Sequence, residues 1–420
     1  MEPQNSAKAS RRNFWLSILN GALMIGTTNS IASPELVLTA FAAYLTSNPL
    51  ILGAIAPIQN ATWALPQIWT IPYVQRARHA LKIYNYAAFL RLIGWTTLTL
   101  TVLFTRDATI LLLTVFAFVL IGGTAAGVAG LPFIEVIGKI IPARQRGLVF
   151  GWRGAIGGIL AIFGSQIVLF FTGPSAHFDF PTNYGLLFLV AGVLQTVGFF
   201  VFSLVHEPET KPTNTSVRPS FRVIRIIWTG DANFRHYVWG RTLFELSSVA
   251  NALILVYASL QLGVRLELAG AYLLISSVLR PVFSIGAGWF SVRLGNRMPV
   301  AFGLLAQALG WGLLLLAPVF GVSGRSAEYY LIPIYSLTAI QKGLIFSNLM
   351  ALGLNVTPND QRALYMGALN TWLGLIIFSG ILSGVIVKTI GYQALFGLSL
   401  ILSCWSAWHF WRLRENFDES

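Results

Sequence analysis

The sequence predicts an all-α polytopic membrane protein, with twelve transmembrane helices in two pseudo-symmetric six-helix bundles. Three observations predict this fold class: the composition, the length of the apolar runs, and motifs that recur at about half the chain length. Of the 420 residues, 55% are hydrophobic and 10% are charged, and the mean hydropathy is +0.69. About a quarter of the residues in a soluble domain are charged. The composition therefore indicates a chain that lies mostly in lipid.

The apolar runs are predicted to be helices. The run ATILLLTVFAFVLIGGTAAGVAG, which starts at Ala108, exceeds the roughly 20 residues that span a bilayer as a helix. Lipid offers no water to backbone polar groups, so a spanning segment is either helical or part of a closed barrel. Barrel strands alternate apolar and polar residues, whereas these runs are apolar on all sides. The predicted spans are 14–45, 50–75, 83–105, 108–140, 148–172, 184–205, 233–262, 267–291, 299–320, 328–355, 364–390 and 391–411.

Two loop segments repeat each other. PARQRGLVFG starts at Pro142 and PNDQRALYMG at Pro358, and their proline, glutamine, arginine and final glycine stay in register. A fixed repeat of this length indicates a duplicated unit. We interpret both loops, with Arg146 and Arg362, as structural and gating elements. The first loop leads into GLVFGWRGAIG, whose G-x-x-x-G spacing predicts close approach to a neighbouring helix.

Basic residues predict the orientation. Most of them fall in loops on one side of the predicted topology, and the other side has only Arg106, Arg265, Arg325 and Lys388. Cytoplasmic loops carry the excess of Lys and Arg, so both termini are predicted to be cytoplasmic. We expect a multi-pass protein of the plasma membrane, which is the inner membrane in a bacterium. The net charge of +13 then reflects topology, and no nucleic-acid partner is expected.

The domain organisation follows from the longest polar break. We predict an N-terminal six-helix bundle at 1–205, a cytoplasmic linker at 206–232 and a C-terminal six-helix bundle at 233–420. Within the linker, Phe221, Ile224 and Trp228 recur at helical spacing while two arginines face away from them. This pattern predicts a short amphipathic helix on the membrane surface.

Six spans, a linker and six spans with matching loops resemble the major facilitator superfamily of transporters. Its motif G-x-x-x-D-R-x-G-x-R/K is expected after the second and eighth spans. The segment GWFSVRLGNR matches it at Gly288, Arg293, Gly295 and Arg297, but Val292 takes the place of the acid. After the second span, IPYVQRARHALK keeps basic residues such as Arg76 and lacks the glycine and the acid. In the family this acid helps latch the two halves together, so the resemblance implies that the latch is weakened or replaced here.

Ionisable residues inside spans are costly, so each of them indicates an ion pair, a cavity or a pathway. Glu135 and Arg153 lie at a similar depth near the cytoplasmic ends of spans four and five. We predict that they form an intradomain ion pair, which Lys139 is close enough to share.

Glu245 and Arg280 lie near the membrane midplane, on spans seven and eight. The resemblance implies a substrate site at this depth between the halves, lined by helices one, four, seven and ten. Glu245 is therefore the best single candidate for a coupling or substrate-binding carboxylate. A purely structural pair of Glu245 with Arg280 or Arg241 is the alternative. Lys342 on span ten suggests attraction of an anionic group, or again a structural pair.

Further polar residues in the spans extend the candidate site. So polar a stretch as GTTNSIASPE in span one faces protein or water, because lipid would leave its polar groups unpaired. The further candidates for substrate or coupling contacts are Asn29, Glu35, Gln59, Asn60, Asn251, Gln341 and Asn370.

The sequence thus predicts a secondary transporter that moves a small solute by alternating access, driven by a proton or other ion gradient or acting as a uniporter. Proton-antiport efflux of drugs or metabolites is the alternative, ahead of a lipid-acting membrane enzyme or a transporter-like receptor. There is no G-x-x-x-x-G-K-[ST] loop, and the histidines show no ligand spacing. We expect no enzymatic activity, no cofactor, no metal and a functional monomer in the bilayer. The aromatic share of 13% favours an amphipathic or aromatic solute.

Overall fold

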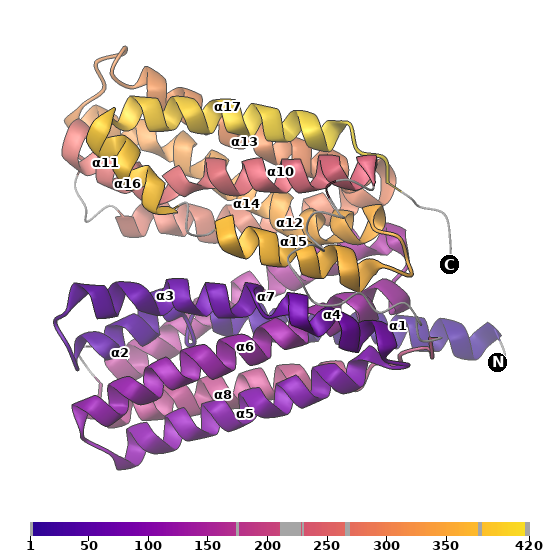
Figure 1. The fold of residues 1–420 in the computed structure, drawn as a ribbon. Coiled ribbons are helices and arrows are strands. Elements are labelled where there is room, and N and C mark those ends of the chain that lie inside the picture. Colours follow the sequence, from indigo (N-terminus) through magenta and orange to yellow (C-terminus); the bar gives the residue numbers. More distant parts are fainter. Residues whose placement is uncertain are drawn as a thin grey trace.

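The computed structural model describes residues 3–173, 176–210, 228, 231–264, 269–376 and 380–415. Figure 1 shows two groups of helices, one from each half of the chain, lying against each other with both termini at the same end. We call this end the terminal end and the other the opposite end. The described residues are helices, turns and loops without a strand, as the predicted fold class requires.

The N-terminal half begins with α1 (Pro3–Thr28), the π-helix η1 (Pro34–Leu38) and α2 (Thr39–Ala43). It continues with α3 (Pro49–Ala64), α4 (Gln67–Arg76), α5 (Ala80–Phe104), α6 (Ala108–Ile140), α7 (Ala143–Thr172) and α8 (Thr182–Ser203).

The C-terminal half begins with α10 (Ala232–Ser248), the 3-10 helix η2 (Val249–Leu253) and α11 (Ile254–Leu262). It continues with α12 (Ala269–Leu294), α13 (Arg297–Leu316), α14 (Gly324–Val356), α15 (Arg362–Ile376), α16 (Gly380–Thr389) and α17 (Tyr392–Trp411).

Several predicted spans are interrupted. Pro34 starts η1 after a turn, and Pro66 separates α3 from α4, because proline lacks an N–H and clashes with the preceding turn. Among the described residues, eight helices are long and apolar enough to cross a membrane. The other predicted spans correspond to α1 with α2, α3 with α4, α12, and α15 with α16. The count of twelve spans stays a prediction.

The linker is described only in part. The predicted amphipathic helix falls outside the described residues apart from Trp228. Helix α8 ends at Ser203 and α10 begins at Ala232, and the division into two bundles and a linker stays a prediction.

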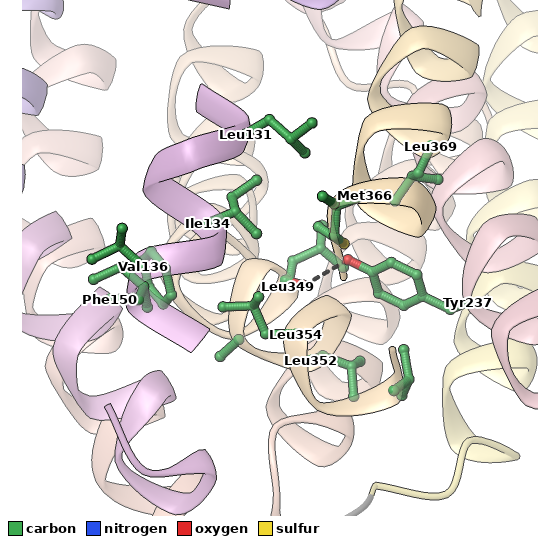
Figure 2. Close-up of a cluster of buried hydrophobic side chains, with 14 of the residues drawn as sticks. Leu131, Ile134, Val136, Phe150, Tyr237, Leu349, Leu352, Leu354, Met366 and Leu369 are labelled. Atoms are coloured by element: carbon green, nitrogen blue, oxygen red, sulfur yellow. Dashed lines mark hydrogen bonds between the residues drawn. The ribbon is translucent and has the colours of Figure 1, made fainter. Parts of the chain in front are cut away.

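Among the described residues, the hydrophobic core that the two halves share lies at the terminal end. A cluster at the terminal end joins Ile134 and Phe150 of the N-terminal half to Leu354 and Met366 of the C-terminal half. Figure 2 shows these side chains meeting across the boundary. On the C-terminal side of the cluster, the Tyr237 hydroxyl donates to the Leu349 carbonyl oxygen at 2.7 Å. Towards the opposite end, the buried described residues form two separate clusters, one in each half.

Helices α7 and α12 hold the halves together along a stripe of glycines. A Cβ atom on Gly151 would lie 2.8 Å from the Ser284 carbonyl oxygen, and one on Gly158 would lie 3.2 Å from Cγ of Pro281. The Ser284 hydroxyl donates to the Gly151 carbonyl oxygen at 3.2 Å. The close approach predicted from the G-x-x-x-G spacing is confirmed, and the partner helix is α12.

Candidate functional site

Four of the predicted site residues line one cavity. Glu245 comes from α10, Arg280 from α12, and Gln341 and Lys342 from α14. Arg241 also lines this cavity, whose volume is about 320 Å³. We call it the charged compartment. Three helices that are distant in sequence thus bring a carboxylate and three cations together inside the C-terminal half.

Glu245 is paired along its own helix. Nη2 of Arg241 lies 3.0 Å from Oε1 of Glu245, at i and i+4 on α10, which is the spacing at which opposite charges meet on a helix. Of the two partners considered for Glu245, the structure has Arg241. The Arg280 guanidinium instead lies over the ring of Phe346, 5.2 Å from its centroid.

A second cavity, of about 270 Å³, lies against the N-terminal half and is mostly apolar. We call it the apolar compartment. Its lining includes Trp63, Phe133 and Phe150, and it shares Phe346 and Met350 of α14 with the charged compartment. Sequence reasoning missed these aromatic residues because an aromatic side chain in a span has the same pattern whether it faces lipid or a cavity.

Arg153 borders the apolar compartment and has neutral partners. Its Nη1 donates to the Ser17 carbonyl oxygen of α1 at 3.0 Å, and its guanidinium lies 4.5 Å from the ring centroid of Phe133 and 5.4 Å from that of Phe150. The cation is therefore stabilised by a carbonyl and by aromatic faces.

The predicted Glu135–Arg153 ion pair is wrong. Glu135 lies 3.6 Å from Nζ of Lys139, one helical turn further along α6, and Lys139 lies 2.9 Å from Oε1 of Glu207. Equal depth in the sequence places two residues at one height but does not set how each helix is rotated. Here α6 turns Glu135 towards Lys139, while α7 turns Arg153 towards α1.

Among the remaining polar candidates, those whose side chains the structure describes line neither compartment. Asn370 of α15 donates through Nδ2 to Oε1 of Gln67 of α4 at 2.7 Å, so it joins the two halves. Asn29 and Asn60 are exposed, and Gln59 and Asn251 are half-buried. Glu35 lies on η1, and its side chain falls outside what the structure describes.

Arg146 forms the main polar contact between the halves at the terminal end. Its guanidinium donates to the carbonyl oxygens of Gly138 and Ile141 in its own half, at 2.8 and 3.1 Å. It also donates to Oδ1 of Asn355 at 2.8 Å and to the Leu354 carbonyl oxygen at 3.4 Å in the other half. Because Arg146 is 5% exposed, these are buried hydrogen bonds to a charged donor.

The repeated arginine, Arg362, is also buried but bonds locally, to Asn359 of its own loop. Its side chain packs over Gly138 of α6, so both repeated loops contact the opposite half. The two arginines of the repeat therefore contact the same turn of α6.

Comparisons with known proteins identify the family. The model of the Major Facilitator Superfamily matches residues 18–380. The chain belongs to the major facilitator superfamily. It is 27% identical over 236 residues to an uncharacterized MFS-type transporter of Mycobacterium tuberculosis, a match that covers 56% of this chain and 50% of the relative. The chain thus spans about half the length of the curated relatives it matches.

Solved structures of the superfamily share the fold. The proton:xylose symporter XylE, bound to a bromo-deoxyglucose, superposes with a TM-score of 0.70 at 15% identity, covering 98% of this chain and 97% of its own. A bacterial homologue of the iron transporter ferroportin, outward-facing, has a TM-score of 0.73 at 12% identity, covering 96% and 98%. The transporter FucP, outward, has a TM-score of 0.73 at 13% identity, covering 94% and 97%.

The superfamily motif after α12 lacks its acid, and a carboxylate from the C-terminal segment lies beside it. Oε1 of Glu415 accepts from the backbone N–H of Arg297 at 2.7 Å, and Oε2 accepts from Nδ2 of Asn296 at 3.0 Å. Oε2 also accepts from Nδ2 of Asn355 at 3.3 Å, the residue that binds Arg146. Glu415 thus connects this loop to the contact between the halves.

The N-terminal half has a similar arrangement. Both oxygens of Glu207 accept backbone N–H groups at the start of α5, from Ala80 at 3.0 Å and from Leu81 at 2.8 Å. Glu207 follows the end of α8 by four residues, and Glu415 follows the end of α17 by four residues. Sequence reasoning missed both glutamates, although an acid at the same distance after the last helix of each half was a usable signal.

The other motif residues hold the shape of this loop. Gly288 is buried against α7, where a Cβ would lie 3.1 Å from the Gly147 carbonyl oxygen, and Gly295 has a φ of 80°. A positive φ suits glycine because it has no Cβ. Arg297 donates through Nη1 to the Leu413 carbonyl oxygen at 2.6 Å, whereas Arg293 and Arg76 are exposed.

We expect Glu415→Gln to loosen the terminal end. The substitution removes the charge that strengthens three hydrogen bonds, each of which contributes about 1.5–3 kcal/mol when a charged group takes part. In a Cys404→Ser background, a cysteine at the buried Ala363 should react at least about tenfold faster with a thiol reagent. Glu209→Gln is the matched control, because Glu209 forms an exposed pair with Arg78 at 3.6 Å. Equal rates in the two variants would contradict the role of Glu415.

Proposed function

We propose that the chain is a secondary active transporter that moves a small solute across the plasma membrane by alternating access, with its terminal end in the cytoplasm. Membership of the superfamily supports the transporter class. The excess of basic residues in the loops at the terminal end supports the orientation. The two compartments that meet at Phe346 and Met350 are the proposed solute site.

The main support for this proposal is where the buried hydrophobic clusters lie in the two halves. At the terminal end one buried cluster spans both halves, while towards the opposite end each half has a cluster of its own. Hydrogen bonds from Arg146 to Asn355 and from Asn370 to Gln67 also join the halves at or near the terminal end. This arrangement supports an outward-facing form, in which the solute site communicates with the opposite end and is closed to the cytoplasm.

Glu245 is the proposed coupling carboxylate, with Glu35 as the second candidate. Glu245 lines the charged compartment and is partly exposed there, and its partner Arg241 is on the same helix. Such a pair can exchange a proton or another cation without breaking a contact between helices. A change of charge at Glu245 would then alter the field in which the solute binds.

The test uses the full chain in proteoliposomes. A solute is first selected from a metabolite and drug library by thermal stabilisation, and its uptake is then measured with and without an imposed pH or ion gradient. We expect Glu245→Gln to lose gradient-driven accumulation about 10- to 100-fold while exchange of solute across the membrane persists. Glu209→Gln, which changes an exposed carboxylate, should behave as the wild type.

Two results would contradict these proposals separately. If Glu245→Gln accumulates solute with unchanged pH dependence, then Glu245 has a structural role only. If the wild type moves no solute that it binds, in either direction and under any gradient, then the transporter function is wrong.

A further inference from the structure

The two compartments differ in the chemistry of their linings. If they form the solute site of a transporter, as proposed above, that difference indicates which chemical groups the solute carries. The apolar compartment is lined by aromatic and aliphatic groups such as Trp63, Phe133 and Phe150. The charged compartment adjoins it at Phe346 and Met350. Their volumes, about 270 and about 320 Å³, together fall in the range of roughly 300–1,000 Å³ of sites that take drug-sized molecules.

Arg280 is a cation of the charged compartment for which the described part of the chain supplies no carboxylate. Among the described residues of the lining, the single carboxylate is that of Glu245, which Arg241 contacts at 3.0 Å. Among the described residues Arg280 forms no ion pair, and its guanidinium lies over the face of Phe346. A guanidinium is planar, and its N–H groups match a carboxylate that binds through two parallel hydrogen bonds.

Gln341 adds an independent observation beside Arg280. It lines the same compartment and is 3% exposed, and its Oε1 is buried without a hydrogen-bond partner in the structure. A buried carbonyl oxygen left unpaired is unfavourable, so such an atom in a binding cavity indicates a donor that arrives with the ligand. A hydroxyl or amide N–H group of the solute would supply it.

We propose that the solute is an amphipathic organic monoanion: a carboxylate that pairs with Arg280, a nearby hydroxyl or amide donor that bonds to Gln341, and an aromatic or apolar body in the apolar compartment. This proposal rests on the proposed function. It assigns Arg280 and Gln341 as substrate-binding residues. The Phe346 ring, which lines both compartments, would contact the solute where its polar and apolar parts join.

The experiment compares binding of acids with binding of their neutral amides. The probes are aromatic hydroxy acids, namely indole-3-lactate, phenyllactate and 4-hydroxyphenyllactate, each with its carboxamide, and lactate as the acid without an apolar body. Binding to the full chain in detergent is measured by thermal stabilisation and by titration calorimetry. We expect the acids to bind at least about tenfold more tightly than their amides and than lactate.

Substitutions at Arg280 and Gln341 test whether these residues cause the preference for acids over amides. Arg280→Gln should weaken binding of the acids about tenfold or more and leave the amides within about twofold, while Arg280→Lys should retain part of the preference. Gln341→Leu should weaken the hydroxy acids more than the same acids without the hydroxyl. Arg106→Gln, which removes an exposed arginine that bonds to Thr182, is the control and should leave every affinity unchanged.

The outcomes separate this inference from the proposed function. Equal binding of acids and amides, an unaltered preference in Arg280→Gln, or no binding of any probe would overturn the substrate class. Tight acid binding without uptake into proteoliposomes would support the site and contradict transport.

Discussion

Replacing Arg146 with alanine is expected to open the terminal end of the protein and to stop net transport. The guanidinium makes four buried hydrogen bonds, two within its own half and two to Leu354 and Asn355 of the other. A hydrogen bond to a charged group contributes about 1.5–3 kcal/mol. Losing two of them across the boundary shifts the equilibrium between the closed and open terminal end by about 3–6 kcal/mol. A transporter held in one conformation no longer alternates.

The shift can be measured as the distance between spin labels on the two halves at the terminal end, together with the reactivity of a cysteine at Ala363. We expect the short-distance population to fall from dominant to minor in Arg146→Ala. Arg144→Ala is the matched control, because Arg144 lies two residues away and is exposed. If both variants keep the wild-type distances, the assignment of Arg146 as the main contact between the halves is wrong.

The substitution Gly151→Val is expected to separate α7 from α12 through packing. The added Cβ would lie 2.8 Å from the Ser284 backbone oxygen and 3.3 Å from Cα of Gly288. Backbone atoms cannot move aside as a flexible side chain can, so α7 and α12 must separate. Overpacking of this kind costs about 1–3 kcal/mol. It also removes the Ser284 hydrogen bond to the Gly151 carbonyl oxygen.

The expected result for Gly151→Val is a lower unfolding temperature in detergent and loss of uptake. Gly286→Val is the control, because it lies on α12 and a Cβ there meets no atom within 4 Å. The control also accounts for the change in helix propensity from glycine to valine. Wild-type stability and uptake in Gly151→Val would mean that α7 and α12 do not need this close approach.

The sequence alone was sufficient for the fold class. Backbone groups in lipid have no water to bind, so a long apolar run is helical whatever its neighbours are. The repeat at Pro142 and Pro358 indicated two related halves, and the glycine spacing on α7 indicated a close helix contact. The cost of charge in lipid selected Glu245, Arg280 and Lys342, and these residues line one cavity in the structure.

Only the tertiary structure decided which polar groups meet. Counting along a span gives the height of a residue but not the rotation of its helix, so Glu135 pairs with Lys139, and Arg153 binds Ser17 and two aromatic rings. Contacts between segments far apart in the chain leave no local pattern. The bond from Arg146 to Asn355 and those of Glu415 to Arg297 depend on how the halves dock. Composition and spacing are set residue by residue along the chain, whereas these partners are set by packing in three dimensions.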